Sequence, residues 1–303
     1  MEDLNSRMPS LTDAEFSDLV KIIYDKTRIQ MSEHKRALVN SRIIKRLRAL
    51  NMSSFKEYID FLKNVSDEEE ITNFINAVTT NKTDFFRENK HFEYMKSNFL
   101  PSWEKSYQEG RVKNLRIWSA ACSTGEEPYT IAMTLHEYFG ERYGKYDIKI
   151  LASDIDTNVL SHAMRGVYKE ESVDPIANSI LKKYFLKGTG EKAGFYKVKE
   201  ILQKDLFFRQ LNFKESDFDI HTMFDLIFCR NVIIYFDKDF QKELFNKFYR
   251  YMKEDSLVFI GHSETLFGIS DKFKYVSSNI GGEGQIRQSQ SLLRCEEGIS
   301  SLF

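Results

Sequence analysis

The stretch that decides the fold runs Leu115-Arg116-Ile117-Trp118-Ser119-Ala120-Ala121-Cys122-Ser123-Thr124-Gly125-Glu126-Glu127-Pro128-Tyr129. A short apolar run gives way to seven consecutive small residues, and an acidic pair, a proline and a new helical pattern follow. This order predicts a strand, a tight loop and the start of a helix. In α/β folds such a loop lies outside the carboxyl end of a strand, where nucleotide-like ligands bind. Its small residues let the backbone approach a ligand beside the free N–H groups of the helix.

The loop differs from the common phosphate-binding loops. Ala121, Ser123 and Gly125 stand where a G-x-G-x-G pattern would place glycines, and no Gly-Lys-Ser/Thr follows. Glu126 and Glu127 take the place of the phosphate-binding lysine. Because carboxylates repel a phosphate, the loop favours a ligand that carries a cationic amino group.

Length and composition set broad limits. The chain has 303 residues, enough for one large domain or two smaller ones, and its net charge of −1 gives no global field that would indicate nucleic acid or a membrane surface. Cys122, Cys229 and Cys295 are far apart and fit neither a disulfide framework nor a metal spacing. No apolar run approaches the ~18 residues of a membrane span, and the N-terminus lacks the apolar core of a signal peptide. We therefore expect a reduced, cytoplasmic protein.

Two kinds of periodicity divide the chain. Capping-box patterns begin apolar helical stripes at Thr12-x-x-Glu15, Ser54-x-x-Glu57 and Ser66-x-x-Glu69, so residues 1–80 are expected to form a helical domain. The acidic run 67–70 is interpreted as helix-cap chemistry rather than a metal site. Within residues 81–278, apolar runs at 115–118, 148–152, 206–211, 224–229 and 257–260 alternate with helical patterns. This predicts a mostly parallel sheet with helices on both faces.

Two further segments break this pattern. Gly188, Gly190 and Gly194 precede an alternation of apolar and charged residues, which predicts a small antiparallel β-subdomain inserted at 187–211. Residues 279–303 show no clear period and begin near Gly281-Gly282-Glu283-Gly284. We expect them to form a poorly ordered tail, which could also be foreign to the fold.

Polar residues follow two of the predicted strands directly. Asp154 and Asp156 end the 148–152 run, where an acid suits two ribose hydroxyls or, alternatively, caps the next helix. After the next strand come Asn212 and Phe213, where a backbone and an amide would meet an adenine, although an Asn at this place is often only a turn residue.

Two other segments carry polar residues that call for an explanation. Arg230 and Asn231 follow a largely apolar strand and are costly to bury alone, so they line the pocket or belong to a buried hydrogen-bond network. The polar stretch 79–88 is either a loop between the two halves or a lid that aims Arg87 at an anionic group.

Five blocks in this order resemble the signature of one family. They are Thr79-Thr80-Asn81-x-Thr83-x-Phe85-Phe86-Arg87-Glu88, Ser119-Ala120-Ala121-x-Ser123-Thr124-Gly125-Glu126-Glu127-Pro128-Tyr129, Ala152-Ser153-Asp154-Ile155-Asp156, Phe228-Cys229-Arg230-Asn231-Val232-x-Ile234-Tyr235-Phe236 and Gly261-His262-Ser263-Glu264. The blocks resemble those of the CheR family, the chemotaxis receptor methyltransferases, over roughly residues 11–278. One block is moderately specific, whereas five in this order are highly specific. Family members end in a strand with an aromatic–basic finish, which residues 279–303 do not show.

The resemblance implies a fold, a cofactor and a reaction. The fold would be an N-terminal all-helical domain plus a Rossmann-like S-adenosylmethionine-dependent methyltransferase domain with a small inserted antiparallel β-subdomain. The donor would be S-adenosyl-L-methionine, leaving S-adenosyl-L-homocysteine, and the acceptors would be chemoreceptor glutamates that become methyl esters during chemotactic adaptation. Carried over by position, the donor site would comprise Asn81, Thr83, Arg87, Ala121, Glu127, Asp154, Asn212, Phe213, Asn231 and Val232. Arg87 and Tyr235 match positions that face the reacting methyl group, and we expect no metal.

Such a reaction needs no dedicated base. A glutamate with a pKa of ~4.3 is already ionised at pH 7, so the scattered histidines are expected to be structural. The enzyme must instead align carboxylate, methyl group and sulfonium in a site with little water. We hypothesise that Arg87 holds the acceptor carboxylate and that Tyr235 shapes its approach.

Two surfaces are candidates for docking a receptor. Residues 35–48 contain six basic side chains and no acid, and Lys35, Arg42 and Arg46 are spaced to share one stripe of a helix. This helix is either a solvated basic face or, as the resemblance implies, docks on the acidic methylation region through Lys35, Arg42, Lys45, Arg46 and Arg48. The predicted β-subdomain, with Gly188, Gly190 and Gly194, is either a surface hairpin or, as in some family members, accepts a receptor C-terminal peptide as an added strand.

Two other functions compete with receptor methylation. One is a different S-adenosylmethionine enzyme, which acts on nucleic acid or on a small molecule. A base-amino methylase would carry an Asn-Pro-Pro-Tyr-like site where this chain has Cys229-Arg230-Asn231-Val232. A non-catalytic receptor-binding module would have lost site residues, and none is lost. We expect a monomer without a nucleic-acid partner, which meets the membrane only through a receptor.

Overall fold

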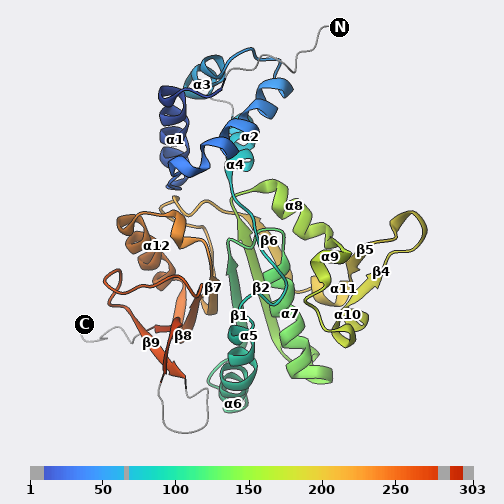
Figure 1. Cartoon of the computed structure of the whole chain (residues 1–303). Helices are drawn as coiled ribbons and strands as arrows, with labels where there is room; N and C mark the ends of the chain where they lie inside the picture. Colours follow the sequence, from blue (N-terminus) through green and yellow to red (C-terminus); the bar gives the residue numbers. More distant parts are fainter. Residues whose placement is uncertain (1–9, 65–67, 279–286, 296–303) are drawn as a thin grey trace.

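The computed structural model describes residues 10–64, 68–278 and 287–295, and places a helical domain above an α/β domain (Figure 1). The helical domain comprises α1 (Asp13–Thr27), η2 (Glu33–Lys35), α2 (Arg36–Ala49), α3 (Phe55–Asn64) and α4 (Glu68–Val78). Its apolar stripes meet in a core of its own around Ile43 and Tyr58. The capping box of Thr12 and Glu15 is confirmed, whereas Ser66 lies outside the described residues.

A sheet of seven strands forms the centre of the α/β domain, in the order β6-β2-β1-β7-β8-β10-β9. Its strands are β1 (Asn114–Ala120), β2 (Asp147–Asp154), β6 (Leu206–Gln210), β7 (Phe224–Cys229), β8 (Met252–Ile260), β9 (Phe273–Ser278) and β10 (Arg287–Cys295). The first five strands in this order are parallel, and β10 pairs antiparallel with both β8 and β9. Each of the predicted apolar runs coincides with one of the parallel strands, except that the run 206–211 extends one residue beyond β6.

Alternate side chains of the central strands point into two separate cores. Leu226 and Phe228 of β7 join the core under α5 (Lys90–Tyr94), α6 (Leu100–Gln108) and α7 (Glu126–Phe139). Their neighbours Ile227 and Cys229 pack with α12 (Lys238–Arg250) on the opposite face. The predicted sheet with helices on both faces is therefore confirmed. Burial on both faces also explains why β7 carries apolar residues at consecutive positions.

A second, three-stranded sheet projects beside α7 and α8 (Thr157–Arg165) (Figure 1). Its strands are β3 (Val167–Lys169), β5 (Phe195–Val198) and β4 (Phe185–Lys187), in that order and antiparallel. The remaining short elements are η3 (Met95–Phe99), η4 (Gly140–Lys145), α9 (Glu170–Val173), α10 (Asn178–Tyr184), η5 (Gly190–Lys192), α11 (Glu200–Gln203) and η6 (Ile233–Tyr235). The predicted small antiparallel sheet is confirmed, but its bounds of 187–211 are wrong. The sheet begins at Val167, and the run from Leu206 belongs to the main sheet because it pairs with β2.

The prediction of a poorly ordered tail is wrong for β10. Leu292 and Leu293 are buried, and they pair with Phe259 and Val258 of β8. A strand that satisfies its backbone groups on two neighbours and buries apolar side chains has a reason to be ordered. Residues 279–286 and 296–303 of the predicted tail lie outside the described residues.

Within the described part of the chain, no helix combines the length and apolar character that crossing a bilayer requires. The all-helical domain, the α/β domain and the small antiparallel sheet together confirm the predicted fold class.

Candidate functional site

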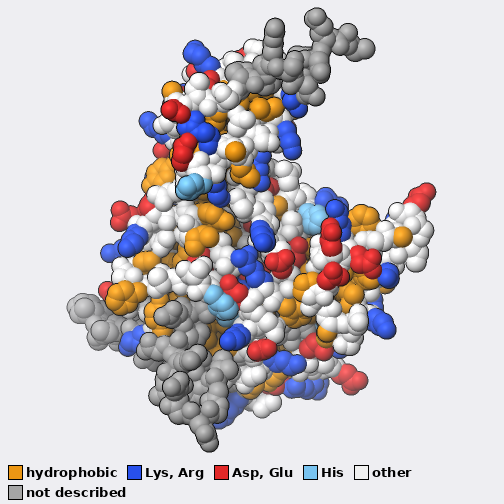
Figure 2. Space-filling view, viewed as in Figure 1, with side chains coloured by type: hydrophobic (Ala, Val, Ile, Leu, Met, Phe, Trp, Pro, Cys, Tyr) orange, Lys and Arg blue, Asp and Glu red, His pale blue; other side chains and the backbone are white. Residues whose placement is uncertain are grey.

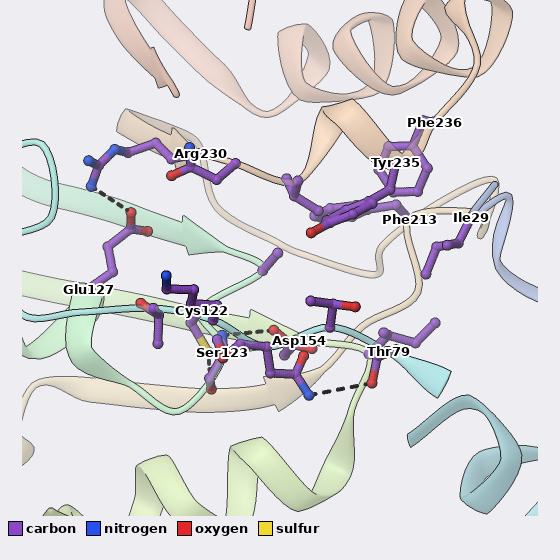
Figure 3. Close-up of a pocket in the computed structure, with 18 of the residues that line it drawn as sticks. Ile29, Thr79, Cys122, Ser123, Glu127, Asp154, Phe213, Arg230, Tyr235 and Phe236 are labelled. Carbon is purple, nitrogen blue, oxygen red and sulfur yellow. Dashed lines mark hydrogen bonds and ion pairs between the residues drawn. The ribbon is translucent and has the colours of Figure 1, made fainter. Parts of the chain in front are cut away.

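A pocket opens at the carboxyl ends of the parallel strands, between the loops that follow β1 and β7 (Figure 3). Here the chain order of the strands reverses, which is where open α/β sheets bind ligands. Every residue predicted for the donor site lines this pocket, as does Tyr235: Asn81, Thr83, Arg87, Ala121, Glu127, Asp154, Asn212, Phe213, Asn231 and Val232. The structure thus brings the predicted set together, and the role of each residue stays a prediction.

The small-residue loop forms the floor of the pocket by an unusual backbone path. Ala121, Ser123 and Gly125 all have positive φ angles, of 68°, 50° and 99°. A Cβ on Gly125 would lie 2.8 Å from the Cβ of Ala163 and 2.9 Å from the hydroxyl of Tyr168, so glycine is required at this turn. The resulting turn leads directly into the N-terminus of α7.

The two roles predicted for the acidic strand end, helix cap and pocket residue, fall to Asp156 and Asp154 respectively. Asp156 caps α8 by accepting the N–H of Asn158 at 2.9 Å. Asp154 instead lines the pocket and accepts the N–H groups of Ser123 at 2.8 Å and Asp156 at 3.0 Å. Burial raises the pKa of the Asp154 carboxyl to about 6. A carboxylate can accept about four hydrogen bonds, so Asp154 keeps acceptor capacity for a ligand that brings hydroxyl groups.

Arg230 joins two carboxylates at the far end of the pocket (Figure 3). Its guanidinium lies 3.0 Å from Glu88 and 3.0 Å from Glu127, and it also donates to the carbonyl of Arg87. Glu127 further accepts the hydroxyl of Ser119 at 2.7 Å. Arg230 therefore belongs to a buried hydrogen-bond network and also lines the pocket, so the two alternatives for this residue are compatible.

Charge and burial act in opposite directions on these two acids. Burial raises the pKa of Glu127, and Arg230 only partly offsets it. For Glu88 burial also raises the pKa, but Arg230, Asn231 and the N–H of His262 outweigh it, and the net shift is downward. The other glutamate of the loop, Glu126, is buried beside Thr124, and burial raises its pKa to about 7.

Glu264 has a structural role that the sequence did not reveal. Its carboxylate accepts the N–H groups of Asn231 at 2.9 Å, Ile233 at 3.0 Å and Gly261 at 2.6 Å. These bonds hold Asn231 at a φ of 57°, at the pocket wall. The Gly261-His262-Ser263-Glu264 block carried the signal, but only the folded chain shows which amides it serves.

An aromatic group closes the opposite side of the pocket. Figure 3 shows Phe213, Tyr235 and Phe236 together, across the pocket from Asp154 and Ser123. The ammonium of Lys35 lies 4.6 Å from the centre of the Tyr235 ring. One side of the pocket thus suits a flat apolar ring and the other a polar group.

Three potential metal ligands converge next to this site. Ligand-type atoms of Glu88, His91 and His262 lie within 4.8 Å of one another. Burial, then Arg230, lowers the pKa of His91 to about 3. The guanidinium of Arg230 already pairs with Glu88, and its charge disfavours a cation at this place.

The predicted docking residues fall into two groups. Lys35, Arg42 and Arg46 are partly buried and contact Thr80, the Thr79 carbonyl and Glu70 respectively. Lys45 and Arg48 are exposed on the helical domain, where Figure 2 shows several Lys and Arg side chains at the surface. Gly188, Gly190 and Gly194 all lie in the turn between β4 and β5.

The fold and the pocket define an α/β enzyme that binds a nucleoside-bearing cofactor at a topological switch point. Two family models match this chain: the CheR methyltransferase all-alpha domain over residues 14–79, and the CheR methyltransferase SAM binding domain over residues 81–281. The chain therefore belongs to the CheR methyltransferase family, and S-adenosylmethionine is its methyl donor.

Curated relatives agree along most of their length. The chain is 41% identical to a chemotaxis protein methyltransferase of Borreliella burgdorferi over 259 residues, which cover 86% of this chain and 90% of the relative. It is 39% identical to one from Escherichia coli over 264 residues, covering 87% and 88%. Chemotaxis protein methyltransferase 2 of Pseudomonas aeruginosa is 41% identical over 271 residues, covering 89% and 92%.

The residues of the pocket fit the donor. S-adenosylmethionine carries an adenine, a ribose with two hydroxyls, and an amino acid end with a cationic amino group. The pocket offers an aromatic wall, the buried carboxylate of Asp154 and the carboxylate of Glu127, whose side chain is 13% exposed.

Proposed function

We propose that this chain methylates glutamate side chains of chemoreceptors, forming glutamate methyl esters that serve adaptation in chemotaxis. The observation that carries the proposal is the convergence of the whole predicted donor set, with Arg87 and Tyr235, on one pocket. The names of the curated relatives support the chemotaxis role. That the chain acts as a monomer stays a prediction.

Three contacts orient the donor in this proposal. Asp154, ionised, accepts the ribose hydroxyls while its backbone partners hold it in place. Phe213 and the turn at Asn212 flank the adenine. Glu127 faces the amino group, and Arg230 prevents Glu127 from turning away.

Bound in this way, the donor supplies a methyl group on a sulfonium, which an ionised carboxylate attacks directly. The chain must then exclude water and align the acceptor. Arg87 is half-buried in the pocket wall, and it donates to the carbonyl of Lys82 at 2.9 Å, which leaves other guanidinium N–H groups for a carboxylate. Tyr235 limits the approach from the mouth of the pocket.

A surface groove gives the acceptor a route to this point. It runs between α1 and η6 and shares Met31, Lys35 and Tyr235 with the donor pocket. Lys21 and Lys35 are its only charged lining residues among the described part of the chain. A cationic groove that ends at the methyl group suits an acidic receptor segment.

Two surfaces would dock the receptor outside the groove. The exposed Lys45 and Arg48 of α2 suit the acidic methylation region. In the small sheet, β4 is an edge strand and its Leu186 is exposed. A C-terminal peptide could therefore pair with β4 as an added strand. Deletion of the turn residues 188–194 should abolish capture of such a peptide while donor binding persists.

Methyl transfer from labelled S-adenosylmethionine to a receptor cytoplasmic fragment tests the proposal. Label that mild alkali releases as methanol identifies a carboxyl methyl ester, and alkali-stable label contradicts one. The variant Arg87→Ala should lower the turnover rate more than the affinity for the donor. An Arg87→Ala enzyme with normal turnover would refute the role of Arg87 and leave the rest of the proposal standing.

A further inference from the structure

The basic side of α2 is in contact with the segment that joins the two domains. Arg42 donates to the carbonyl of Thr79, and the ammonium of Lys35 donates to the hydroxyl of Thr80 at 3.0 Å. Both cations are partly buried. Burial and the nearby charge of Arg42 lower the pKa of Lys35, as expected for a lysine that faces a neighbouring segment.

This segment continues directly into the donor site. The hydroxyl of Thr79 donates to the carboxylate of Asp156 at 2.8 Å, and the side-chain amide of Asn81 donates to the same oxygen at 2.7 Å. The carbonyl of Asn81 accepts the hydroxyl of Ser123 at 3.0 Å. Thr79 and Asp156 are buried, so these bonds are shielded from competing water.

The same chain of bonds ends on the carboxylate proposed to hold the ribose. The N–H groups of Ser123 and Asp156 both donate to Asp154. The path from α2 to Asp154 therefore consists of Arg42, Thr79, Asp156 and then Asp154, without a gap. Figure 1 shows the same arrangement at the level of the elements, with α2 beside α4 at the point where the chain enters the α/β domain.

We propose that Arg42 and Lys35 are positioning residues of the donor site, which hold residues 79–81 in the conformation that binds S-adenosylmethionine. Arg42 does not line the donor pocket, and Lys35, which does, acts in this role through its bond to Thr80. The inference rests on the proposed donor site and not on the identity of the acceptor. It is therefore tested with the donor alone, so its failure leaves receptor methylation untouched.

Exposure distinguishes these residues from other cations of α2. Lys45 lies on the same helix and carries the same charge as Arg42, but it is exposed, whereas Arg42 is partly buried and bonded to the Thr79 carbonyl. If the basic side chains acted only by attracting an acidic receptor, Arg42 and Lys45 would have equal effects on donor binding, namely none. If Arg42 positions residues 79–81, replacing Arg42 weakens donor binding and replacing Lys45 does not.

The test is calorimetric titration of the full-length protein with S-adenosylmethionine in the absence of receptor. Arg42→Ala removes a charge-assisted hydrogen bond and should raise the Kd for the donor by roughly tenfold. Arg42→Lys keeps a cationic donor and should give an intermediate Kd. Lys45→Ala should match the wild-type donor Kd even though it weakens receptor capture.

Thermal unfolding followed by tryptophan fluorescence separates positioning from a loss of structure. Both tryptophans, Trp103 and Trp118, are buried in the α/β domain, so their signal reports the domain that binds the donor. For Arg42→Ala we expect a higher donor Kd and an unchanged unfolding midpoint of this domain. A wild-type Kd for Arg42→Ala would overturn the proposal. If Arg42→Ala does not fold, Arg42→Gln, which removes the charge and keeps most of the side-chain length, provides the same test, and a wild-type donor Kd for that variant would equally overturn it.

Discussion

Replacing Arg230 by methionine should destabilise the α/β domain severely, by an amount that depends on pH. The Arg230 side chain is 2% exposed and lies 3.0 Å from each of two carboxylates, Glu88 and Glu127. Methionine keeps the apolar bulk against Phe92 but leaves both acids without a counter-charge. Breaking a buried pair costs about 3–5 kcal/mol, which corresponds to a fall of roughly 10 °C in the midpoint of a domain of this size.

The pH dependence identifies the cause of this loss. In the wild-type protein the pKa of Glu88 is lowered. Its pair with Arg230 therefore stabilises the fold fully at pH values above the usual carboxyl pKa, and this stabilisation is lost as the pH falls through the lowered pKa. In the variant, Glu88 and Glu127 are buried without a cation, and their pKa values rise above that range. The penalty should therefore be complete at pH 8 and decline towards pH 5, as both acids take up protons.

Urea unfolding monitored by tryptophan fluorescence at pH 8 and pH 5 provides the measurement. Arg111→Gln is the control, because the ion pair of Arg111 with Glu109 is largely exposed and should contribute less than about 1 kcal/mol. A loss in Arg230→Met that is equal at the two pH values would mean that packing, not charge, makes Arg230 important. A loss as small as that of the control would refute the double ion pair altogether.

Two other outcomes follow from the donor site. Donor affinity should fall by roughly tenfold between pH 8 and pH 5, because Asp154 has a pKa of about 6 and loses the charge that accepts hydroxyl groups. In calorimetry, Asp154→Asn should bind the donor weakly, with an affinity that does not change over this pH range. If the affinity of the variant still changes with pH, another group is responsible for the titration. Gly125→Ala should abolish donor binding and lower stability by about 1–3 kcal/mol, since its Cβ would lie 2.8 Å from that of Ala163. Gly110→Ala, at a glycine that also has a positive φ but has nothing within 4 Å of its Cβ, should show only the backbone cost of about 1–2 kcal/mol and normal donor binding. Equal effects of the two variants would exclude the contact at Ala163 as the cause.

The location of the donor site could be predicted because it depends on local patterns. Asp154, Asn212 and Asn231 each lie at or just beyond the carboxyl end of a parallel strand, and these strand ends meet at one edge of the sheet. A polar residue at such a place has few alternatives to the pocket. The resemblance then supplied the members that no pattern marks, such as Thr83.

The partners of the buried charges could not be predicted in the same way. A buried arginine after β7 requires a counter-charge, but the chain holds 45 acidic residues and nothing local selects Glu88 and Glu127 from them. The three amides that Glu264 accepts are likewise brought together only by the path of the chain after β7 and β8. These contacts depend on tertiary placement, so their residues can be suspected from sequence but not paired.

The errors in the bounds of the small sheet have a related cause. The strand β3 has only three residues, too few to display a period of two, and its partner β5 follows almost thirty residues later. The run from Leu206 has a pattern that fits either sheet, and its pairing with β2 decides its membership. The same limitation applies to β10, because a segment of mixed composition becomes ordered only when β8 and β9 offer it backbone partners.

The basic stripe of α2 shows what helical spacing can and cannot predict. Spacing correctly places Arg42 and Arg46 on one side of the helix, but it does not tell whether that side meets solvent or another segment. Here it meets α4 and residues 79–81, so Arg42 already has a partner in the Thr79 carbonyl. An acidic receptor segment that recruits Arg42 must compete with this bond, and binding free energies are reciprocal. Receptor docking and donor binding would then be coupled through one side chain, a connection that neither a basic stripe nor a donor loop reveals by itself.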